Sequence, residues 1–314
     1  MKRTRLTFTD RDQWLAARTQ GIGASEVATI VGLNPWETPY LLWRRKTGLD
    51  APKPENTAMA TGHILEDGVA QFWARETGRE IIRNSRTDFM FVDAEHRELR
   101  VSPDRTYWLG GTRNDDNKGI LECKTTRLVI DEDDIPRHWF VQVQMNLGVA
   151  GYTQGSLAWL SAAKGFEFGY RDLQFVPEFY EWLKHETLRF WRDNVLGGVE
   201  PPAVSPQDVI LKYDHSTAGL TATADEDTYR AYCDLKEVRR EIDALEERKA
   251  DLEGKLKAAF KDAEALAYNG ETIATWRSPK PTRRFDAKRF QADYPGMAED
   301  YYTETQGSRR LLLK

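Results

Sequence analysis

The sequence predicts a soluble α/β protein in which helices flank a mixed sheet. Three observations predict this class: helical signals come first, three short strand-like segments follow, and a helix that is apolar nearly all round comes next. Nine of the ten tryptophans lie before residue 201, which places the main core in that part of the chain. The 314 residues allow one large domain or two ordinary ones.

Capping residues and glycines delimit the expected helices. Thr9 and Thr38-Pro39 are start signals, whereas Gly48 and Gly78 are stop signals. The strand-like segments are short and are separated by turn residues. In chain order we expect a helix after Thr9, helices over 38–48 and 63–76, strands over 88–92, 99–104 and 119–125, and a buried helix over 138–150.

We place this core at residues 1–200. The rest of the chain divides into a linker over 201–222, a helical segment over 223–265 and a hairpin-containing region over 266–314. Asn269-Gly270 is the signal for a two-residue hairpin turn. A coiled-coil-like seam runs along the helical segment in alternating steps of three and four residues, and it fits either an intramolecular helix pair or a dimer. Its members are Leu235, Val238, Ile242, Leu245, Lys249, Leu252, Leu256 and Ala259.

Composition excludes several classes of protein. Two cysteines cannot build a disulfide framework, and a net charge of −5 argues against a uniformly basic surface for nucleic acid. No run of 18 apolar residues occurs, so we expect no membrane span and no membrane partner. The first residues lack the apolar run of a signal peptide. We therefore expect a reducing, cytoplasmic location.

The segment Glu122-Cys123-Lys124 carries the sharpest chemical signal. The two-residue period of a strand points Glu122 and Lys124 to one face and Cys123 to the other. Asp104 ends the preceding strand, and the polar loop over 110–119 is long enough to bring it beside Glu122. Two converging carboxylates favour a hard divalent cation, Mg²⁺ or Mn²⁺. The alternative is an ordinary ion pair between Glu122 and Lys124 on a solvated face.

Two helices offer further polar groups. Glu66 emerges from the face of its helix that Val69 and Trp73 should bury, so it needs a partner unless it bends to solvent. Gln142 and Gln144 lie in the buried helix, where an amide is costly without hydrogen bonds. We expect one glutamine to face the metal site and the other to pack against backbone.

The N-terminal segment predicts an anion site. Trp14 and Arg18 lie one helical turn apart, and Gly21, Gly23 and Ser25 precede a short helix. Backbone N–H groups, a hydroxyl and a guanidinium can meet there on one phosphate. The alternative is a glycine turn with Ser25 as a simple helix cap.

Six blocks in this order resemble the signature of YqaJ-type phage recombination nucleases, which are relatives of lambda exonuclease in the PD-(D/E)xK nuclease superfamily. The blocks are RTQGIGASE at 18–26, GLNPW at 32–36, GHILE at 62–66, SPD at 102–104, LECKT at 121–125 and QVQ at 142–144. The tail also resembles the C-terminal region of that family. The resemblance implies a restriction-endonuclease-like core, a central mixed sheet flanked by helices, with the helical segment and hairpin added to it.

The resemblance also assigns roles to these residues. It implies that Asp104 and Glu122 hold one or two Mg²⁺ ions, for which Mn²⁺ can substitute, with Glu66 and the backbone carbonyl of Cys123 completing the metal shell. It implies that Lys124 orients or deprotonates the attacking water. The glutamine of the last motif is expected to be Gln144, with Gln142 second. Cys123 departs from the aliphatic residue common at its position, which should leave catalysis intact.

For DNA, the resemblance implies that Arg18, Ser25 and Ser102 grip the 5′-terminal phosphate and that Trp14 lies near the terminal nucleotide. It implies a phage or prophage enzyme in a bacterial host cell, which degrades linear double-stranded DNA from 5′-phosphorylated ends and works with a single-strand annealing protein. A homo-oligomer is expected, because lambda exonuclease is a ring-shaped trimer around the duplex. Candidates to line such a channel are Arg44, Arg45, Lys46 and Arg127.

Two other functions fit the same residues. A related endonuclease has the same metal centre but cuts internally. A non-catalytic DNA-binding or assembly protein uses the helical segment and has an eroded nuclease core, although the presence of Asp104, Glu122 and Lys124 argues against erosion.

Overall fold

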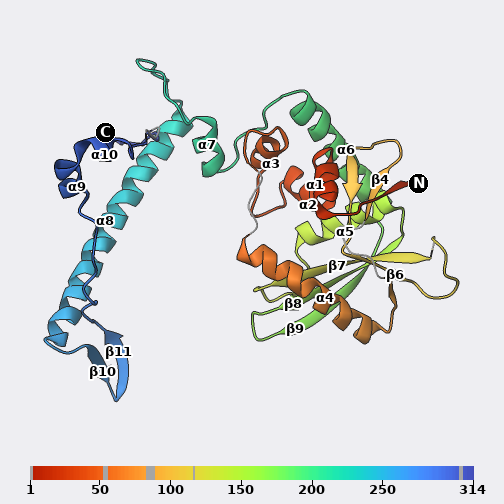
Figure 1. Ribbon diagram of the computed structural model, residues 1–314, viewed down its shortest axis with the longest axis horizontal. Coiled ribbons are helices and arrows are strands. Elements are labelled where there is room, and N and C mark those ends of the chain that lie inside the picture. Colours follow the sequence, from red (N-terminus) through yellow and green to blue (C-terminus); the bar gives the residue numbers. More distant parts are fainter. Residues whose placement is uncertain (1–2, 52–55, 83–88, 116, 304–306) are drawn as a thin grey trace. The chain divides into compact units, whose positions relative to one another are not determined.

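The computed structural model describes residues 3–51, 56–82, 89–115, 117–303 and 307–314, and the chain forms two compact units, residues 1–212 and 213–314 (Figure 1). The first unit is a mixed α/β structure, as the sequence predicted. Among the helices formed by the described residues, none combines the length and apolar character needed to cross a bilayer.

A five-stranded mixed sheet forms the centre of the first unit. Its strand order is β3-β6-β7-β8-β9, in which β7 and β8 are parallel and the other neighbours are antiparallel. The strands are β3 (Ile81–Ile82), β6 (Arg105–Trp108), β7 (Lys118–Thr126), β8 (Gln154–Ser161) and β9 (Glu167–Gln174).

Two helices cover the two faces of this sheet (Figure 1). Helix α5 (Arg137–Ala150) connects the parallel strands β7 and β8, and its apolar side chains pack with Ile120 and Leu157. Helix α4 (Thr57–Thr77) packs on Leu121 through Trp73, which is fully buried. Burial of a large aromatic side chain contributes about 2–3 kcal/mol. These two layers fix β7 from both sides.

A second, smaller sheet has the order β1-β4-β5-β2. Its strands are β1 (Arg3–Thr7), β2 (Ile22–Gly23), β4 (Phe89–Asp93) and β5 (Leu99–Val101). The parallel pairing of β2 with β5 brings the segment after Arg18 beside the chain that leads to Ser102.

The pairing of β7 differs from our expectation. We expected the strand over 99–104 to return beside 119–125, but β5 ends at Val101 in the smaller sheet, and β6 is the antiparallel neighbour of β7. Asp104 lies in the link between β5 and β6. Strands β8 and β9 also follow the buried helix, beyond the three strands that we expected.

The remaining helices of the first unit surround these layers. They are α1 (Arg11–Thr19), α2 (Ala24–Ile30), α3 (Pro39–Lys46), α6 (Pro177–Arg189), the π-helix η1 (Phe190–Leu196) and α7 (Pro206–Lys212). Helix α7 lies in the stretch expected to be a linker. It belongs to the first unit because buried Asp208 accepts a hydrogen bond from Thr38 at 2.8 Å.

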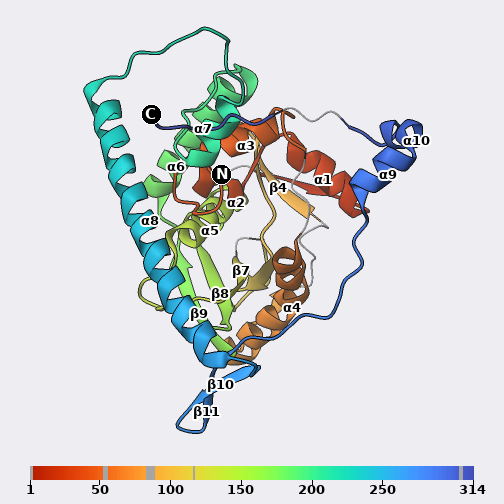
Figure 2. The same cartoon turned by 90° about the vertical axis from the view of Figure 1, so that its left-hand side faces the viewer.

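The second unit contains the long helix α8 (Glu226–Phe260) and a hairpin of β10 (Ala265–Tyr268) and β11 (Glu271–Thr275) (Figure 2). Asn269 and Gly270 have φ angles of 52° and 86°, which confirms the predicted two-residue turn. Short helices α9 (Ala287–Asp293) and α10 (Pro295–Glu299) follow. The chain end returns to α8, where the Tyr232 hydroxyl donates to the Lys314 carbonyl at 2.6 Å.

Candidate active site

Strand β7 presents Glu122 and Lys124 to the face of the sheet that α5 covers. Ile120 packs among the apolar residues of α5, whereas Leu121 and Cys123 pack on the side of α4. Side chains alternate along a strand, so Glu122 and Lys124 share the side of Ile120. This confirms the orientation predicted for the three consecutive residues.

Glu122 is 1% exposed and accepts hydrogen bonds from three side chains. Lys124 Nζ lies 2.7 Å from Oε1, Gln142 Nε2 donates to the same oxygen, and Asn146 Nδ2 donates to Oε2 at 3.0 Å. Gln142 and Asn146 are four residues apart on α5, so both reach the strand from one side of the helix. These donors satisfy a carboxylate that would otherwise be costly to bury.

Gln142, rather than Gln144, belongs to this group. Gln142 Oε1 accepts from Lys124 Nζ at 2.8 Å, which holds the ammonium between Glu122 and the amide. Gln144 instead donates to the Gln174 carbonyl at 2.8 Å and accepts from the backbone N–H of residue 176 at 2.9 Å. Residues two apart on a helix point to different sides, so one glutamine faces Glu122 and the other faces backbone. This placement reverses the order that we expected.

Asp104 joins the site from the link between β5 and β6. It is 3% exposed, and its Oδ2 accepts a hydrogen bond from the backbone N–H of Cys123 at 2.8 Å. This bond ties Asp104 to β7 at the residue next to Glu122.

The Cys123 thiol is buried beside this site. Burial raises its pKa well above the usual range, and the charges of Asp104, Glu122 and Glu66 raise the pKa further. The hydrogen bond from the Cys123 N–H places Asp104 beside β7, next to Glu122.

The partner that Glu66 needs is Arg105, which sequence reasoning missed. Arg105 Nη1 lies 2.7 Å from Glu66 Oε1 and Nη2 lies 2.5 Å from Asp67 Oδ1. Burial lowers the pKa of Arg105, but the carboxylates of Asp67 and Glu66 outweigh burial and raise it. The only sequence signal for Arg105 was its position directly after Asp104.

The donor set fits a hard divalent cation in its chemistry. Asp104 and Glu122 are nearly buried carboxylates, and Asn146 Oδ1 beside them is buried with no hydrogen-bond partner among the described residues. A buried amide oxygen left unsatisfied costs about 1–3 kcal/mol, so a ligand there is favoured. In the described part of the chain, no group of three or more His, Cys, Asp or Glu side chains lies close enough together to hold a metal ion. Glu66 is paired with Arg105.

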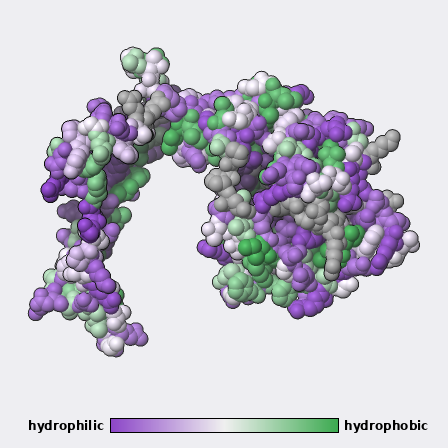
Figure 3. All heavy atoms as spheres, viewed as in Figure 1, coloured by the Kyte–Doolittle hydropathy of each residue, from purple (hydrophilic) through white to green (hydrophobic). Residues whose placement is uncertain are grey.

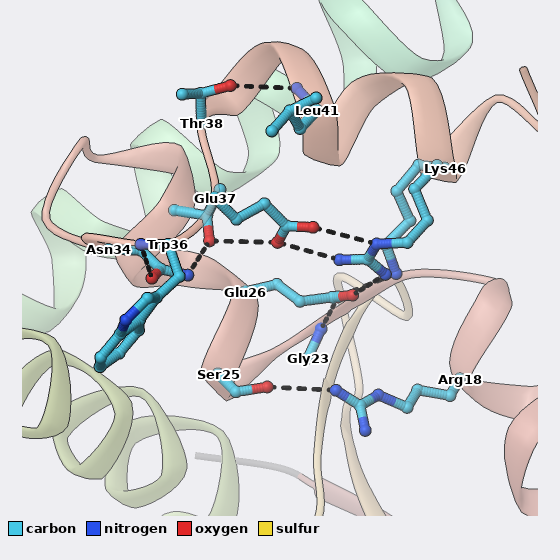
Figure 4. Close-up of polar contacts among 12 residues, drawn as sticks. Arg18, Gly23, Ser25, Glu26, Asn34, Trp36, Glu37, Thr38, Leu41 and Lys46 are labelled. Atoms are coloured by element: carbon cyan, nitrogen blue, oxygen red, sulfur yellow. Dashed lines mark hydrogen bonds and ion pairs between the residues drawn. The ribbon is translucent and has the colours of Figure 1, made fainter. Parts of the chain in front are cut away.

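The three residues predicted to grip a terminal phosphate form one connected cluster with Trp14, which we call the anion cluster. Arg18 Nη2 donates to Ser25 Oγ at 3.1 Å (Figure 4), and the Arg18 guanidinium lies 5.2 Å from the centre of the Trp14 ring. Trp14 Nε1 donates to Ser102 Oγ at 3.0 Å. Residues from α1, α2 and the link after β5 are thus connected through Arg18 and Trp14.

Glu26 supports this cluster from within the core, and its importance was not apparent from the sequence. It is 4% exposed and accepts from the Gly23 backbone N–H and from Lys46 Nζ, both at 2.8 Å, and from Arg45 Nη1 at 2.9 Å (Figure 4). Burial alone would raise the pKa of Glu26, but the charges of Lys46, Arg18 and Arg45 lower it to about 2. Its place three residues after Gly23, as in a capping box, was the available signal.

The structure pairs the basic residues of α3 with carboxylates of their own unit. We expected Arg44, Arg45 and Lys46 to line a DNA channel, and that role stays a prediction. The pairs are Arg44 with Asp50 at 2.8 Å, Arg45 with Glu26 at 2.9 Å and Glu37 at 3.2 Å, and Lys46 with Glu26 at 2.8 Å. Arg127, just beyond β7, is exposed, and its expected contact with DNA stays a prediction.

An exposed aromatic side chain without a predicted role lies beside His138 of α5. Trp36 is 68% exposed, and its ring meets the edge of His138 with centres 5.1 Å apart. Burial lowers the pKa of His138, and the charge of Lys124 lowers it further.

Residues 13–153 match the model of the YqaJ-like viral recombinase domain. The uncharacterized protein YqaJ of Bacillus subtilis (strain 168) is 30% identical over 313 residues, which cover 95% of this chain and 93% of the relative. This chain belongs to the YqaJ family. The matched range contains Asp104, Glu122 and Lys124 as well as the anion cluster, and the resemblance drawn from the sequence blocks is confirmed.

Two solved structures are also similar to this chain. The alkaline exonuclease LHK-Exo from Laribacter hongkongensis is 17% identical, with a TM-score of 0.44, and the match covers 58% of this chain and 91% of that one. A phage-related exonuclease from Haemophilus somnus 129PT is 10% identical, with a TM-score of 0.41, and the match covers 57% of this chain and 96% of that one. Likeness of this strength does not by itself assign an activity.

Proposed function

We propose that this YqaJ-family protein is a Mg²⁺-dependent deoxyribonuclease of the PD-(D/E)xK type. It degrades linear double-stranded DNA from 5′-phosphorylated ends and leaves 3′ single strands for recombination. The observation that carries the proposal is the link between two groups of residues. Ser102 belongs to the anion cluster, and Asp104 belongs to what we call the catalytic group, which is Asp104, Glu122, Lys124 and Gln142. Two residues span at most about 7 Å, so a phosphate held at one group places the neighbouring phosphodiester near the other.

The catalytic group has the parts that phosphodiester hydrolysis needs. Asp104 and Glu122 would hold the cation. Glu66 would join them if the cation replaced Arg105 as its partner. The backbone carbonyl of Cys123 remains an expected ligand. A bound Mg²⁺ or Mn²⁺ supplies charge neutralisation at the phosphate and lowers the pKa of a water molecule. Lys124, fixed by Glu122 and Gln142, orients the attacking water and stabilises developing negative charge.

The anion cluster explains a preference for phosphorylated ends. A terminal phosphate carries more negative charge than an internal phosphodiester and offers three oxygens to donors. The Arg18 guanidinium and the Ser25 hydroxyl provide those donors, and Glu26 fixes the backbone before Ser25 through the Gly23 N–H. Trp14 places an aromatic ring at the same cluster, where it contacts both Arg18 and Ser102.

The proposal includes partners. Double-stranded DNA is the substrate, and a single-strand annealing protein receives the 3′ strands. A homo-oligomer provides a continuous DNA-binding surface, to which exposed Arg127 contributes.

The test is digestion of three DNA substrates in Mg²⁺ or in chelator. We expect rapid loss of a linear duplex with 5′-phosphates, slower loss of the same duplex with 5′-hydroxyl ends, and no cleavage of a covalently closed circle. Cleavage of the circle would favour an endonuclease with the same metal centre. If none of the substrates is cut in Mg²⁺ or Mn²⁺, the proposal fails and a DNA-binding role replaces it.

A further inference from the structure

The long helix α8 carries an apolar face that the second unit leaves exposed. The seam defined above contains five large apolar residues that are each 46–62% exposed, and Figure 3 shows apolar surface along this helix among charged groups. They are Val238, Ile242, Leu245, Leu252 and Leu256. The hairpin follows the C-terminal end of α8. Near the N-terminal end of α8, the Lys314 carbonyl accepts hydrogen bonds from Tyr232 and Lys236. These described contacts lie at the two ends of the helix and leave the seam uncovered.

We propose that the seam binds a second copy of this chain, as an antiparallel coiled coil with a two-fold axis near residue 247. In this register every seam position meets a seam position of the partner, because the two residues of each pair lie equally far before and after residue 247. The layers are Leu235 with the partner's Ala259, Val238 with the partner's Leu256, Ile242 with the partner's Leu252, and Leu245 with the partner's Lys249.

The charge distribution along α8 selects the antiparallel direction. Residues 226–247 carry eight acidic and four basic side chains, a net charge of −4, whereas residues 248–260 carry four basic and two acidic side chains, a net charge of +2. Antiparallel packing sets the acidic half of one helix against the basic half of the other. It also opposes the two helix dipoles, whereas parallel packing aligns them.

Lys249, the polar member of the seam, gives the same direction. In a parallel helix pair in register, Lys249 faces the partner's Lys249, and Glu241 faces the partner's Glu246 across the flanking positions, so both contacts repel. In the antiparallel register, Lys249 lies over the partner's Leu245 with the partner's Glu246 next to it. Its alkyl stem then packs on leucine, while its ammonium reaches a carboxylate. In the structure Lys249 is 74% exposed and lies 3.9 Å from Glu253 of its own helix.

The first test is the mass of the full chain in solution, measured by light scattering after size exclusion. We expect twice 36.1 kDa at micromolar concentration. Leu245→Asp should give a monomer, because it puts a carboxylate into the seam. Ala244→Asp is the control: it adds the same carboxylate one residue away, on the solvent side of the helix, and should stay dimeric. Circular dichroism checks that both variants keep α8. A wild-type monomer, a trimer, or a dimer that survives Leu245→Asp overturns the proposal.

The second test is the direction of the helices, read by disulfide formation. Exposed Cys233 is first replaced by serine, and buried Cys123 is left in place. Val238→Cys combined with Leu256→Cys in one chain should form a covalent dimer on oxidation, and neither single replacement should. In a parallel pair each cysteine would face its own copy, so covalent dimers of the single variants overturn the antiparallel register. Neither test requires nuclease activity, so the outcome is separate from that of the proposed function.

Discussion

Replacing Glu26 by glutamine tests how strongly the buried ion cluster supports the first unit. The amide keeps an acceptor for the Gly23 N–H but removes the negative charge that faces Lys46 and Arg45. The Lys46 side chain is 5% exposed, so the change leaves a nearly buried ammonium without its counter-charge. Breaking a buried ion pair in this way typically costs about 3–5 kcal/mol.

The pKa of Glu26 gives an independent magnitude. It falls from 4.5 to about 2 on folding, and each pKa unit corresponds to about 1.4 kcal/mol, so ionisation of Glu26 contributes about 3 kcal/mol at neutral pH. Because the folded pKa is lower than the unfolded one, this contribution is complete above pH 4.5 and is lost as the pH falls towards 2. We expect Glu26→Gln to lower the free energy of unfolding by about 3 kcal/mol at pH 7 and by much less at pH 3.

The assay is urea unfolding followed by tryptophan fluorescence, which reports mainly on the first unit because nine of the ten tryptophans lie there. At pH 7 the thermal midpoint should also fall, by about 6–12 °C. Glu37→Gln is the matched control, because the Glu37 side chain is 19% exposed and Arg45 keeps Glu26 as a partner. This variant should lower the free energy of unfolding by less than about 1 kcal/mol. Equal losses for the two variants, or a Glu26→Gln loss that is the same at pH 3, would refute the reasoning.

Three further predictions concern the active site. Glu122→Gln should reduce Mg²⁺-dependent DNA cleavage at least a hundredfold in a gel assay, with the circular dichroism spectrum unchanged; retained activity contradicts its role. Gln142→Ala should slow cleavage at least tenfold with little loss of stability. Gln144→Ala should instead lower the free energy of unfolding by about 1–3 kcal/mol. The reverse result would make Gln144 the glutamine that acts in catalysis. Arg18→Ala should reduce the preference for 5′-phosphorylated over 5′-hydroxyl ends more than it weakens duplex binding; equal loss on both ends excludes the phosphate contact.

Local patterns in the sequence predicted most of what depends on neighbouring residues. The alternation of Glu122, Cys123 and Lys124 follows from the strand period, and the turn at Asn269-Gly270 follows from the need for positive φ at both positions. The grouping of Arg18 with Ser25 followed from a short loop.

Features that depend on distant residues were missed or misplaced. Strand β6, not the strand before Asp104, pairs with β7, because pairing is decided by the whole sheet. The basic residues of α3 looked available for DNA, but Glu26 lies 19 residues before Arg45 and only the fold brings them together. Arg105 directly follows Asp104 and Asn146 lies one helical turn beyond Gln142, but neither residue belongs to a motif, and only the fold shows that they reach the site.

The most direct test of the proposed activity is release of labelled nucleotide from the 5′-phosphorylated end of a linear duplex, with wild-type protein and Lys124→Ala compared at equal Mg²⁺ and protein concentrations. The residue arrangement predicts steady release of label by the wild type, none in chelator, and at least a hundredfold slower release by Lys124→Ala. Equal rates for the two proteins, or release that continues in chelator, would contradict a catalytic centre built on Asp104, Glu122 and Lys124.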